Sequence, residues 1–284
     1  MVEAITDHTP VTVVGNANEE PAMNDVVLGV DVGGTGIKGG LVDLRAGRLV
    51  GHRFRVNTPQ PGTPDEVTKA IVAVAEHFTF AGPVGVAFPG VVLDGVVHTA
   101  AHLHKDWVGA SLTDLVAPRL KGPATFLNDA DAAGLAEAHF GAARGVQGVV
   151  VVVTFGTGIG VAMINNGELV ANCELGHIEI DNADAELIAA ASARERNNQT
   201  WAEWGANADR YLRTLERLVW PKLFVLGGGI TRNPEKWVRY LSPRTPIKLA
   251  EAVNNAGIIG AADAAWMRHA DATDLIAHRT GRSR

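Results

Sequence analysis

Asn128 and Asp129 stand together directly after the apolar run "ATFL", and both side chains can take part in proton transfer or hydroxyl binding. An aspartate can accept the proton of an attacking hydroxyl, while a neighbouring asparagine orients that hydroxyl. Phosphoryl transfer relies on this kind of positioning and on charge stabilisation. A purely structural role as a helix N-cap is the alternative, because Asn and Asp are preferred there. The pair makes Asp129 the candidate catalytic base.

A glycine-rich turn near the N-terminus is the first candidate site for phosphate. The stretch 26–44, "VVLGVDVGGTGIKGGLVDL", has the spacing G-x-G-x-x-G from Gly34 onward, which also occurs in dinucleotide-binding folds. A dinucleotide site needs a helix after the glycines, whereas "GLVDLRAGRLVGHRFRV" has the alternation and central turn of a β-hairpin. We therefore predict a turn whose N–H groups bind phosphate, with Asp31 as a cation ligand and Lys38 as a positive charge. A tight turn without a ligand is the alternative.

The glycine turn recurs later in the chain. Residues 149–170 repeat the pattern, and Gly156 aligns with Gly34 at an offset of 122 positions (156 − 34), about the length of a domain. A third run, "LFVLGGGIT", places glycines at the end of another predicted strand, at the edge where α/β sheets bind ligands. The predicted phosphate-binding residues of the three turns are Asp31, Gly33, Gly34, Thr35, Gly36, Lys38, Thr154, Gly156, Thr157, Gly158, Gly228 and Gly229.

A polar stretch, "CELGHIEID", is the candidate acceptor site. Glu174 and His177 share one face if the stretch is helical, whereas His177, Glu179 and Asp181 share one if it is extended. Metal binding and a simple solvated surface are both open interpretations. Near a catalytic aspartate, these groups would accept and donate hydrogen bonds to the vicinal hydroxyls of a sugar.

The elements that must position these residues alternate between strand and helix. Apolar periodicity predicts helices over residues 64–78, 129–143, 200–220 and 256–270, with Ser111 capping a further short one. Short apolar strands precede each candidate site. A chain of 284 residues with 46% hydrophobic composition supports two α/β lobes, with a hinge near residue 128.

Composition excludes several other classes of protein. No apolar run is long enough to span a membrane, and residues 1–22 lack the features of a signal peptide, so a cytoplasmic protein with a disordered N-terminal tail is expected. The single Cys173 excludes an intrachain disulfide and a cysteine-rich zinc site. A net charge of −6 argues against a broad basic face for nucleic acid.

The motifs together resemble a known family. "DVGGTGIKGG", "AFPG", "LNDADAAG", "TFGTGIG" and "ELGH" occur in the order found in ROK sugar kinases, members of the actin–hexokinase superfamily, over residues 26–266. "HKDWVG", "ARERNNQTWAEW", "WPKLFVLGGGIT" and "NNAGIIGAA" resemble the branch of polyphosphate glucokinases and polyphosphate/ATP glucomannokinases. The resemblance implies a two-lobed actin/hexokinase-like (ribonuclease H-like) α/β fold, with duplicated domains around a cleft. It implies a small lobe over 23–127, a large lobe over 128–253, and a C-terminal helix over 254–284 that joins the small lobe.

The resemblance also implies an activity. The protein would transfer a phosphoryl group from polyphosphate, and also ATP, to the 6-hydroxyl of glucose or mannose, with Mg2+ as cofactor, as a cytoplasmic homodimer. Asp129 would be the base, and the sugar would be bound by Asn128, Asp129, Glu174, His177 and Glu186. Glu179 is the rival of Glu186. An ATP-dependent kinase for glucose or an amino sugar, and a sugar sensor without turnover, are the alternatives.

The sequence departs from many family members at one place. They carry a cysteine-rich zinc loop after the "GH" motif, whereas "IEIDNADAE" contains no cysteine. We therefore expect no structural zinc and a His177 that is free to contact the sugar. A basic cluster is the candidate path for polyphosphate, with a solvated hairpin face as the alternative. Its members are Lys38, Arg45, Arg48, Arg53 and Arg55.

Overall fold

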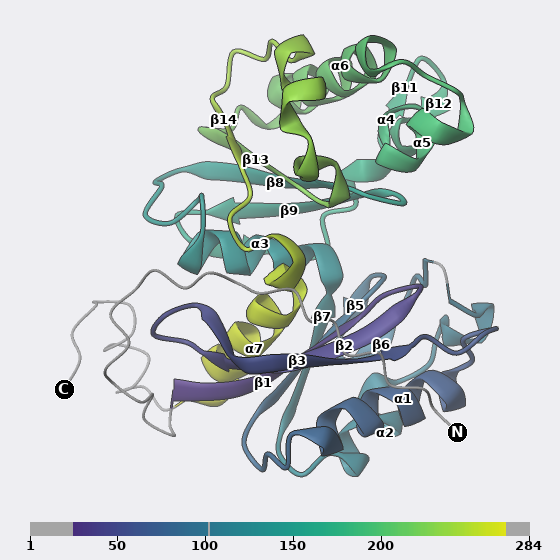
Figure 1. Cartoon of the computed structure of the whole chain (residues 1–284), viewed down its shortest axis with the longest axis vertical. Helices are drawn as coiled ribbons and strands as arrows, with labels where there is room; N and C mark the ends of the chain where they lie inside the picture. Colours follow the sequence, from purple (N-terminus) through teal and green to yellow (C-terminus); the bar gives the residue numbers. More distant parts are fainter. Residues whose placement is uncertain (1–24, 102, 271–284) are drawn as a thin grey trace. The chain divides into compact units, whose positions relative to one another are not determined.

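The computed structural model describes residues 25–101 and 103–270, and its chain divides into two units (Figure 1). Among the described residues, unit 1 combines those from 25 to 132 with those from 257 to 270, and unit 2 comprises residues 133–256. The corresponding divisions expected from the sequence are at residues 128 and 254. The expectations for residues 1–22 and for the end of the C-terminal helix, 271–284, lie outside the described residues.

Unit 1 is built on a five-stranded sheet in the order β3-β2-β1-β4-β7. The strands are β1 (Val26–Val32), β2 (Gly36–Asp43), β3 (Arg48–Asn57), β4 (Val84–Phe88) and β7 (Ala124–Asn128). β1, β2 and β3 form an antiparallel meander, while β4 and β7 run parallel to β1. The predicted hairpin after the first glycines is therefore confirmed. A small hairpin, β5 (Val92–Leu93) and β6 (Val96–Val97), follows β4.

Helices cover both faces of this sheet (Figure 1). One face carries α1 (Pro64–His77) and α2 (Leu112–Leu115), and the other carries α7 (Ala256–His269). Thr63 and Glu66 form a capping box that starts α1, and Ser111 caps α2. α7 approaches the strands closely because Gly29 and Gly85 lack side chains there, where a Cβ would overlap the α7 backbone.

Unit 2 repeats the arrangement with its own sheet, ordered β10-β9-β8-β13-β14. The strands are β8 (Val149–Phe155), β9 (Ile159–Asn165), β10 (Glu168–Val170), β13 (Leu223–Gly227) and β14 (Ile247–Leu249). The smaller elements are β11 (Glu179–Ile180), β12 (Ala183–Asp184), α4 (Ala185–Ala189) and α5 (Ala191–Arg196). The longer helices are α3 (Asp129–Phe140) and α6 (Trp201–Val219). The boundary between the units falls within α3. Thr200 starts α6 with a capping box.

An aromatic cluster fills the core between the second sheet and α6. Phe155 on β8 packs edge-on against Trp204 and Tyr211 of α6, and Trp204 packs against Trp237. The indole N–H of Trp204 donates to the carbonyls of Ala189 and Ala190, which satisfies its polar group in the interior. The core thereby fixes α4 and α5 against the end of β8.

The two sheets share one topology. In each, an antiparallel meander of three strands is followed by two parallel strands, and a glycine turn joins the first two. The pair Val32 and Ile37 closes the first turn, and Phe155 and Ile159 close the second. The offsets are 123 (155 − 32) and 122 (159 − 37), so the first turn is one residue longer. The internal duplication expected from the sequence is present.

Candidate active site

The candidate residues of unit 1 gather at one edge of its sheet. Parallel strands β1, β4 and β7 end together, because Asp31 pairs with Ala87 and Phe88 pairs with Asn128. The glycine turn follows β1, the "AFPG" turn follows β4, and Asp129 follows β7. Two strand spacings of ~4.8 Å separate β1 from β7, so the glycine turn and Asp129 start about 10 Å apart across the sheet. This carboxyl edge is where open α/β sheets bind ligands.

The first glycine turn, residues 33–36, is held by the end of β3 and the segment after it. The carbonyl of Gly33 accepts from Thr58 Oγ1 at 2.5 Å, and the carbonyl of Gly34 accepts from Gln60 Nε2 at 3.4 Å. The carbonyl of Thr35 accepts from Arg55 Nη2 at 2.8 Å. Three successive carbonyls of the turn are therefore directed at a single neighbouring segment.

Peptide geometry sets the direction of the N–H groups in this turn. A trans peptide directs its carbonyl and the following N–H to opposite sides. The N–H groups of Gly34, Thr35 and Gly36 therefore lie away from the segment that binds the carbonyls. Successive N–H groups on one side form a concavity that binds anions. Positive φ plays no part, since Gly33 and Gly36 have ordinary φ values.

A carboxylate and an ammonium group flank this turn. Lys38 Nζ lies 3.0 Å from Asp31 Oδ2, and the exposed fractions of the two side chains are 26% and 14%. The carboxylate of Asp31 also lies beside Gly257 in the first turn of α7, where a Cβ would overlap it.

Asn128 and Asp129 occupy different positions at the start of α3. Asn128 is buried, and its Oδ1 accepts from the N–H groups of Ala130 and Asp131 at 2.8 and 3.1 Å, so it is the residue that caps α3. Its Nδ2 donates to the carbonyl of Gly90 at 3.1 Å. Asp129 is half-buried as the first residue of α3.

The second glycine turn, residues 156–158, is held in a similar way within unit 2. Ser192 of α5 donates its N–H to the carbonyl of Gly156 at 3.1 Å and its hydroxyl to the carbonyl of Thr157. By the same geometry, the N–H groups of Thr157 and Gly158 lie away from Ser192. Thr154 precedes the turn on β8, and its hydroxyl donates to the carbonyl of Gly160.

The glycines after β13 lie beside the end of β8. Gly227 pairs with Thr154 across the two strands. Gly228 has a φ of 86°, and a Cβ there would overlap the backbone of Phe155, so the position requires glycine on two grounds. The third glycine, Gly229, begins a short 3-10 helix with open space around it.

A polar chain connects His177 to the second glycine turn. Nδ1 of His177 lies 2.9 Å from Asp184 Oδ2, while Asp184 Oδ1 accepts the N–H of Glu186 at 2.8 Å and caps α4. Glu186 Oε2 in turn accepts the N–H of Ile159 at 2.9 Å. Glu174 Oε2 lies 3.7 Å from Nε2 of His177. These groups raise the pKa of His177, chiefly through the hydrogen bond to Asp184, against an opposing contribution from burial.

The two rival glutamates occupy different places. Glu186 is half-buried, and a Cβ on Gly158 would overlap its carboxylate, so the second glycine turn and Glu186 are in close contact. Glu179 is exposed on β11, whose backbone pairs with β12 at Asp184. The stretch "CELGHIEID" that contains Glu179 is neither a continuous helix nor a continuous strand, because a 3-10 turn over Leu175–His177 precedes β11.

Several residues with a part in this geometry were missed by sequence reasoning. Asp184, Ser192 and Thr58 hold candidate residues in place but belong to no predicted motif. Their signal in the sequence is weak, since Ser, Thr and Asp are common caps of turns and helices. Of these three residues, only Asp184 stands where a helix N-cap is expected, two residues before Glu186.

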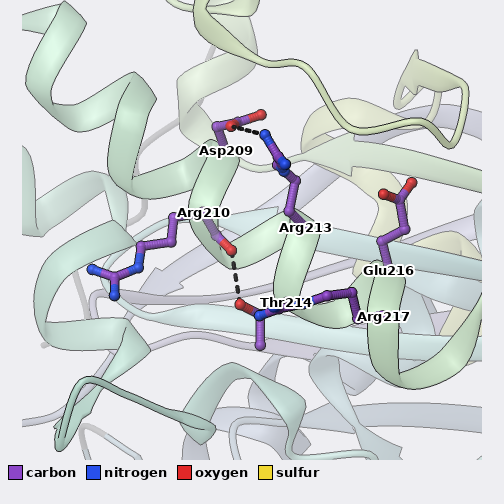
Figure 2. Close-up of a pocket in the computed structure, with 6 residues that line it drawn as sticks. All are labelled: Asp209, Arg210, Arg213, Thr214, Glu216 and Arg217. Carbon is purple, nitrogen blue, oxygen red and sulfur yellow. Dashed lines mark hydrogen bonds and ion pairs between the residues drawn. The ribbon is translucent and has the colours of Figure 1, made fainter.

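A surface cavity with a volume of about 430 Å³ lies elsewhere, on α6 (Figure 2). It is lined by Asp209, Arg210, Arg213, Thr214, Glu216 and Arg217. Its cations are largely neutralised locally, because Arg213 pairs with Asp209 and Arg210 pairs with Asp181. None of the predicted site residues lines it.

Metal ligands and membrane spans were sought over the same residues. Within 25–101 and 103–270, no group of three or more His, Cys, Asp or Glu side chains is arranged to hold a metal ion. Among the helices in these ranges, none is both long enough and apolar enough to cross a membrane.

Comparison with known proteins places this geometry in a family. The model of the ROK family matches residues 27–187. A polyphosphate glucokinase of Mycobacterium tuberculosis (strain CDC 1551 / Oshkosh) is 50% identical over 236 residues, which cover 83% of this chain and 89% of that protein.

Two solved structures are similar in fold. An inorganic polyphosphate/ATP-glucomannokinase from Arthrobacter sp. strain KM has a TM-score of 0.83 and 48% identity, covering 86% of this chain and 99% of that one. A ROK family glucokinase from Streptomyces griseus, in complex with glucose and AMPPNP, has a TM-score of 0.71 and 27% identity, covering 84% and 99%. The fold is the duplicated α/β architecture of actin/hexokinase-like sugar kinases. The chain therefore belongs to the ROK family, and the glycine turns and the aspartate after β7 agree with this similarity.

Proposed function

We propose that this protein is a polyphosphate-dependent hexokinase that phosphorylates glucose, and also mannose, at the 6-hydroxyl, with ATP as a second donor. The observation that carries the proposal is the 50% identity to a polyphosphate glucokinase over 89% of that protein's length. The fold similarity to a polyphosphate/ATP-glucomannokinase supports the second donor and the second sugar. The family resemblance supports a cytoplasmic homodimer, and light scattering tests the dimeric state.

Unit 1 supplies the base and the groups that bind the donor. Asp129 accepts the proton of the sugar 6-hydroxyl as its oxygen attacks the terminal phosphorus of the donor. The bond from that phosphorus to the bridging oxygen breaks, and the shortened donor leaves with the electron pair. The N–H groups of the first glycine turn and the ammonium of Lys38 stabilise the charge on the transferred group.

Unit 2 supplies the acceptor groups and further donor contacts. Glu174, His177 and Glu186 bind the sugar hydroxyls together with Asn128, and Asp184 keeps His177 in one orientation. Between the two glutamates left open by the sequence, the contact of Glu186 with the second glycine turn favours it over the exposed Glu179. The N–H groups of Thr157 and Gly158, with Gly228 and Gly229, complete the phosphate-binding set.

Magnesium fits the residues present if the donor supplies most of its ligands. Asp31 is a single partly buried carboxylate at the first glycine turn, which is the kind of oxygen ligand that Mg2+ accepts beside phosphate oxygens and water. When bound, Mg2+ neutralises charge on the donor oxygens. Asp31 would hold the ion, and the ammonium of Lys38 beside it would contact phosphate.

The test is hexose 6-phosphate formation by purified protein with Mg2+ and glucose or mannose, with nucleotide-free polyphosphate and ATP supplied separately. Product with polyphosphate supports the proposal. Product with ATP alone retains a ROK sugar kinase and rejects polyphosphate as donor. No product with either donor, in a protein that still binds glucose by calorimetry, identifies a sensor without turnover.

A further inference from the structure

Arg55 occupies a defined position beside the first glycine turn. Its Nη2 donates to the carbonyl of Thr35 at 2.8 Å, and its Nη1 donates to Asn57 Oδ1 at 2.9 Å. A Cβ on Gly36 would overlap the guanidinium, so the absence of a side chain at Gly36 is what allows Arg55 to lie there. The φ of Gly36 is not positive, so the backbone conformation does not require glycine there. The close approach of the Arg55 guanidinium does.

The neighbours of Arg55 across the sheet are charged. Lys38 on β2 is the direct cross-strand partner of Arg55 on β3, and Asp31 on β1 is the partner of Lys38. Directly opposite side chains have their Cβ atoms about 4.5–5.5 Å apart, and like charges in such pairs are destabilising. One carboxylate thus faces two cations, and the two hydrogen-bond acceptors of Arg55 given above are neutral. The row has a net positive charge, and Arg55 brings it to the side of the turn that presents the carbonyl of Thr35.

The other members of the predicted basic cluster do not all share this place. Arg45 pairs with Asp25, and Arg48 is the cross-strand partner of Asp43, at the end of the hairpin remote from the glycine turn. Seven residues of β2 separate that end from the turn, which is about 23 Å of strand. The path along the whole cluster stays a prediction, whereas Lys38 and Arg55 flank the turn itself.

We propose that Arg55 binds the phosphoryl chain of the donor next to the first glycine turn. The inference rests on the proposed function and extends it to a residue outside the family motifs. A guanidinium has five N–H donors in a fixed fork, and two of these hold it on Thr35 and Asn57. The others present a fork that suits two phosphoryl oxygens, as arginine does wherever phosphate is recognised bidentately. Its ligand is any linear donor with at least two phosphoryl groups.

The test uses binding as well as turnover. Arg55→Gln and Arg55→Lys are compared with Arg119→Gln, an exposed arginine beside the first residues of β1 and β4, away from the glycine turn. Tripolyphosphate affinity is measured by calorimetry at two salt concentrations, without sugar, and glucose affinity is measured separately. We expect Arg55→Gln to weaken tripolyphosphate binding about 10- to 100-fold, Arg55→Lys to recover part of the loss, and Arg119→Gln to change it less than about twofold.

A structural role is separated from a binding role by two readouts. Binding through Arg55 predicts unchanged glucose affinity and a weaker dependence of tripolyphosphate binding on salt in Arg55→Gln, because one cation fewer meets the anion. Equal losses of glucose and tripolyphosphate affinity, or an unchanged salt dependence, would overturn the inference.

The outcome is also distinct from that of the proposed function. If the wild-type protein forms hexose phosphate while Arg55→Gln keeps its donor affinity and donor KM, the inference fails and the function stands. If the wild-type protein forms no product but loses tripolyphosphate binding on Arg55→Gln, the function fails and the binding role stands. A wild-type protein that binds no tripolyphosphate overturns the inference directly.

Discussion

Asp184 binds His177 with one carboxylate oxygen and the first turn of α4 with the other. The distance from Oδ2 to Nδ1 of His177 is 2.9 Å, and the distance from Oδ1 to the backbone nitrogen of Glu186 is 2.8 Å. The imidazole and the helix that carries Glu186 are therefore positioned by the same side chain. Any change at Asp184 acts on both proposed sugar contacts.

Asp184→Asn is expected to lower the pKa of His177, because the hydrogen bond to this carboxylate is the largest cause of its raised value. The folded-state pKa lies above the ordinary value of ~6.5, so the stability from this pair is complete below pH 6.5 or so and is lost as pH rises through the raised pKa. The effect on stability is small since the His177 side chain is 50% exposed. NMR titration of the imidazole measures the change in its pKa. In a profile of the sugar KM against pH, the midpoint should move to lower pH together with this pKa. An unchanged titration would show that Asp184 does not set the proton affinity of His177.

Asp129→Asn should lower kcat by about 10²- to 10⁴-fold while largely retaining glucose affinity, since it removes a general base and preserves the side-chain shape. The exposed Asp114 of α2 offers a control of the same chemistry, and Asp114→Asn should leave kcat unchanged. Steady-state kinetics and glucose calorimetry make the comparison. Turnover at the wild-type rate in Asp129→Asn would assign the base elsewhere.

Gly158→Ala should raise the KM for glucose about tenfold or more, because the new methyl group would displace the Glu186 carboxylate from the second glycine turn. Glu186→Gln provides the comparison, as it leaves the shape and removes the charge. If Gly158→Ala affects only the donor KM, the contact with Glu186 has no role in sugar binding.

Gly85→Ala should destabilise unit 1 by about 2–4 kcal/mol, because the Cβ would overlap the carbonyl of Ala261 and push α7 away from the sheet. Urea unfolding measures the free energy of unfolding. Gly260→Ala, which meets the carbonyl of Ala132, should behave similarly. A loss below about 1 kcal/mol at both positions would mean that α7 moves aside at little cost.

Glu137→Ala should destabilise unit 2 by about 3–5 kcal/mol, because the buried carboxylate accepts the N–H groups of Ala142, Glu251 and Ala252. Removing it leaves three backbone donors without that acceptor. The exposed Glu235 provides the control, with an expected change within about 0.5 kcal/mol for Glu235→Ala. Equal stability of the two variants would contradict the assignment.

Much of the fold was predictable from local pattern. The capped helices α1 and α6, the hairpin after the first glycines and the repeat at an offset of 122 all follow from periodicity, capping residues and turn residues close together in the chain. The step at Asn128 and Asp129 was also visible, although the sequence did not decide which of them caps α3.

The supporting contacts of the site were not predictable in this way. Arg55 reaches Thr35 from 20 positions away, and Ser192 reaches Thr157 from 35 positions away. Such contacts depend on strand register and on the packing of separate elements, which no local pattern reports. The glycines were predicted as parts of turns whose N–H groups bind phosphate, whereas at Gly36 and Gly158 the structure shows that they also make room for a side chain.

The division of the chain has a consequence for its synthesis on the ribosome. The sheet of unit 1 is encoded first, yet the helix that covers one of its faces, α7, is encoded after all of unit 2. Residues 133–256 can therefore complete their own core while the glycine-lined face of the earlier sheet is still bare. Unit 1 is therefore the first unit to be started and the last to be completed. Until α7 emerges, the uncovered strands of unit 1 are the part of the nascent chain most in need of a chaperone.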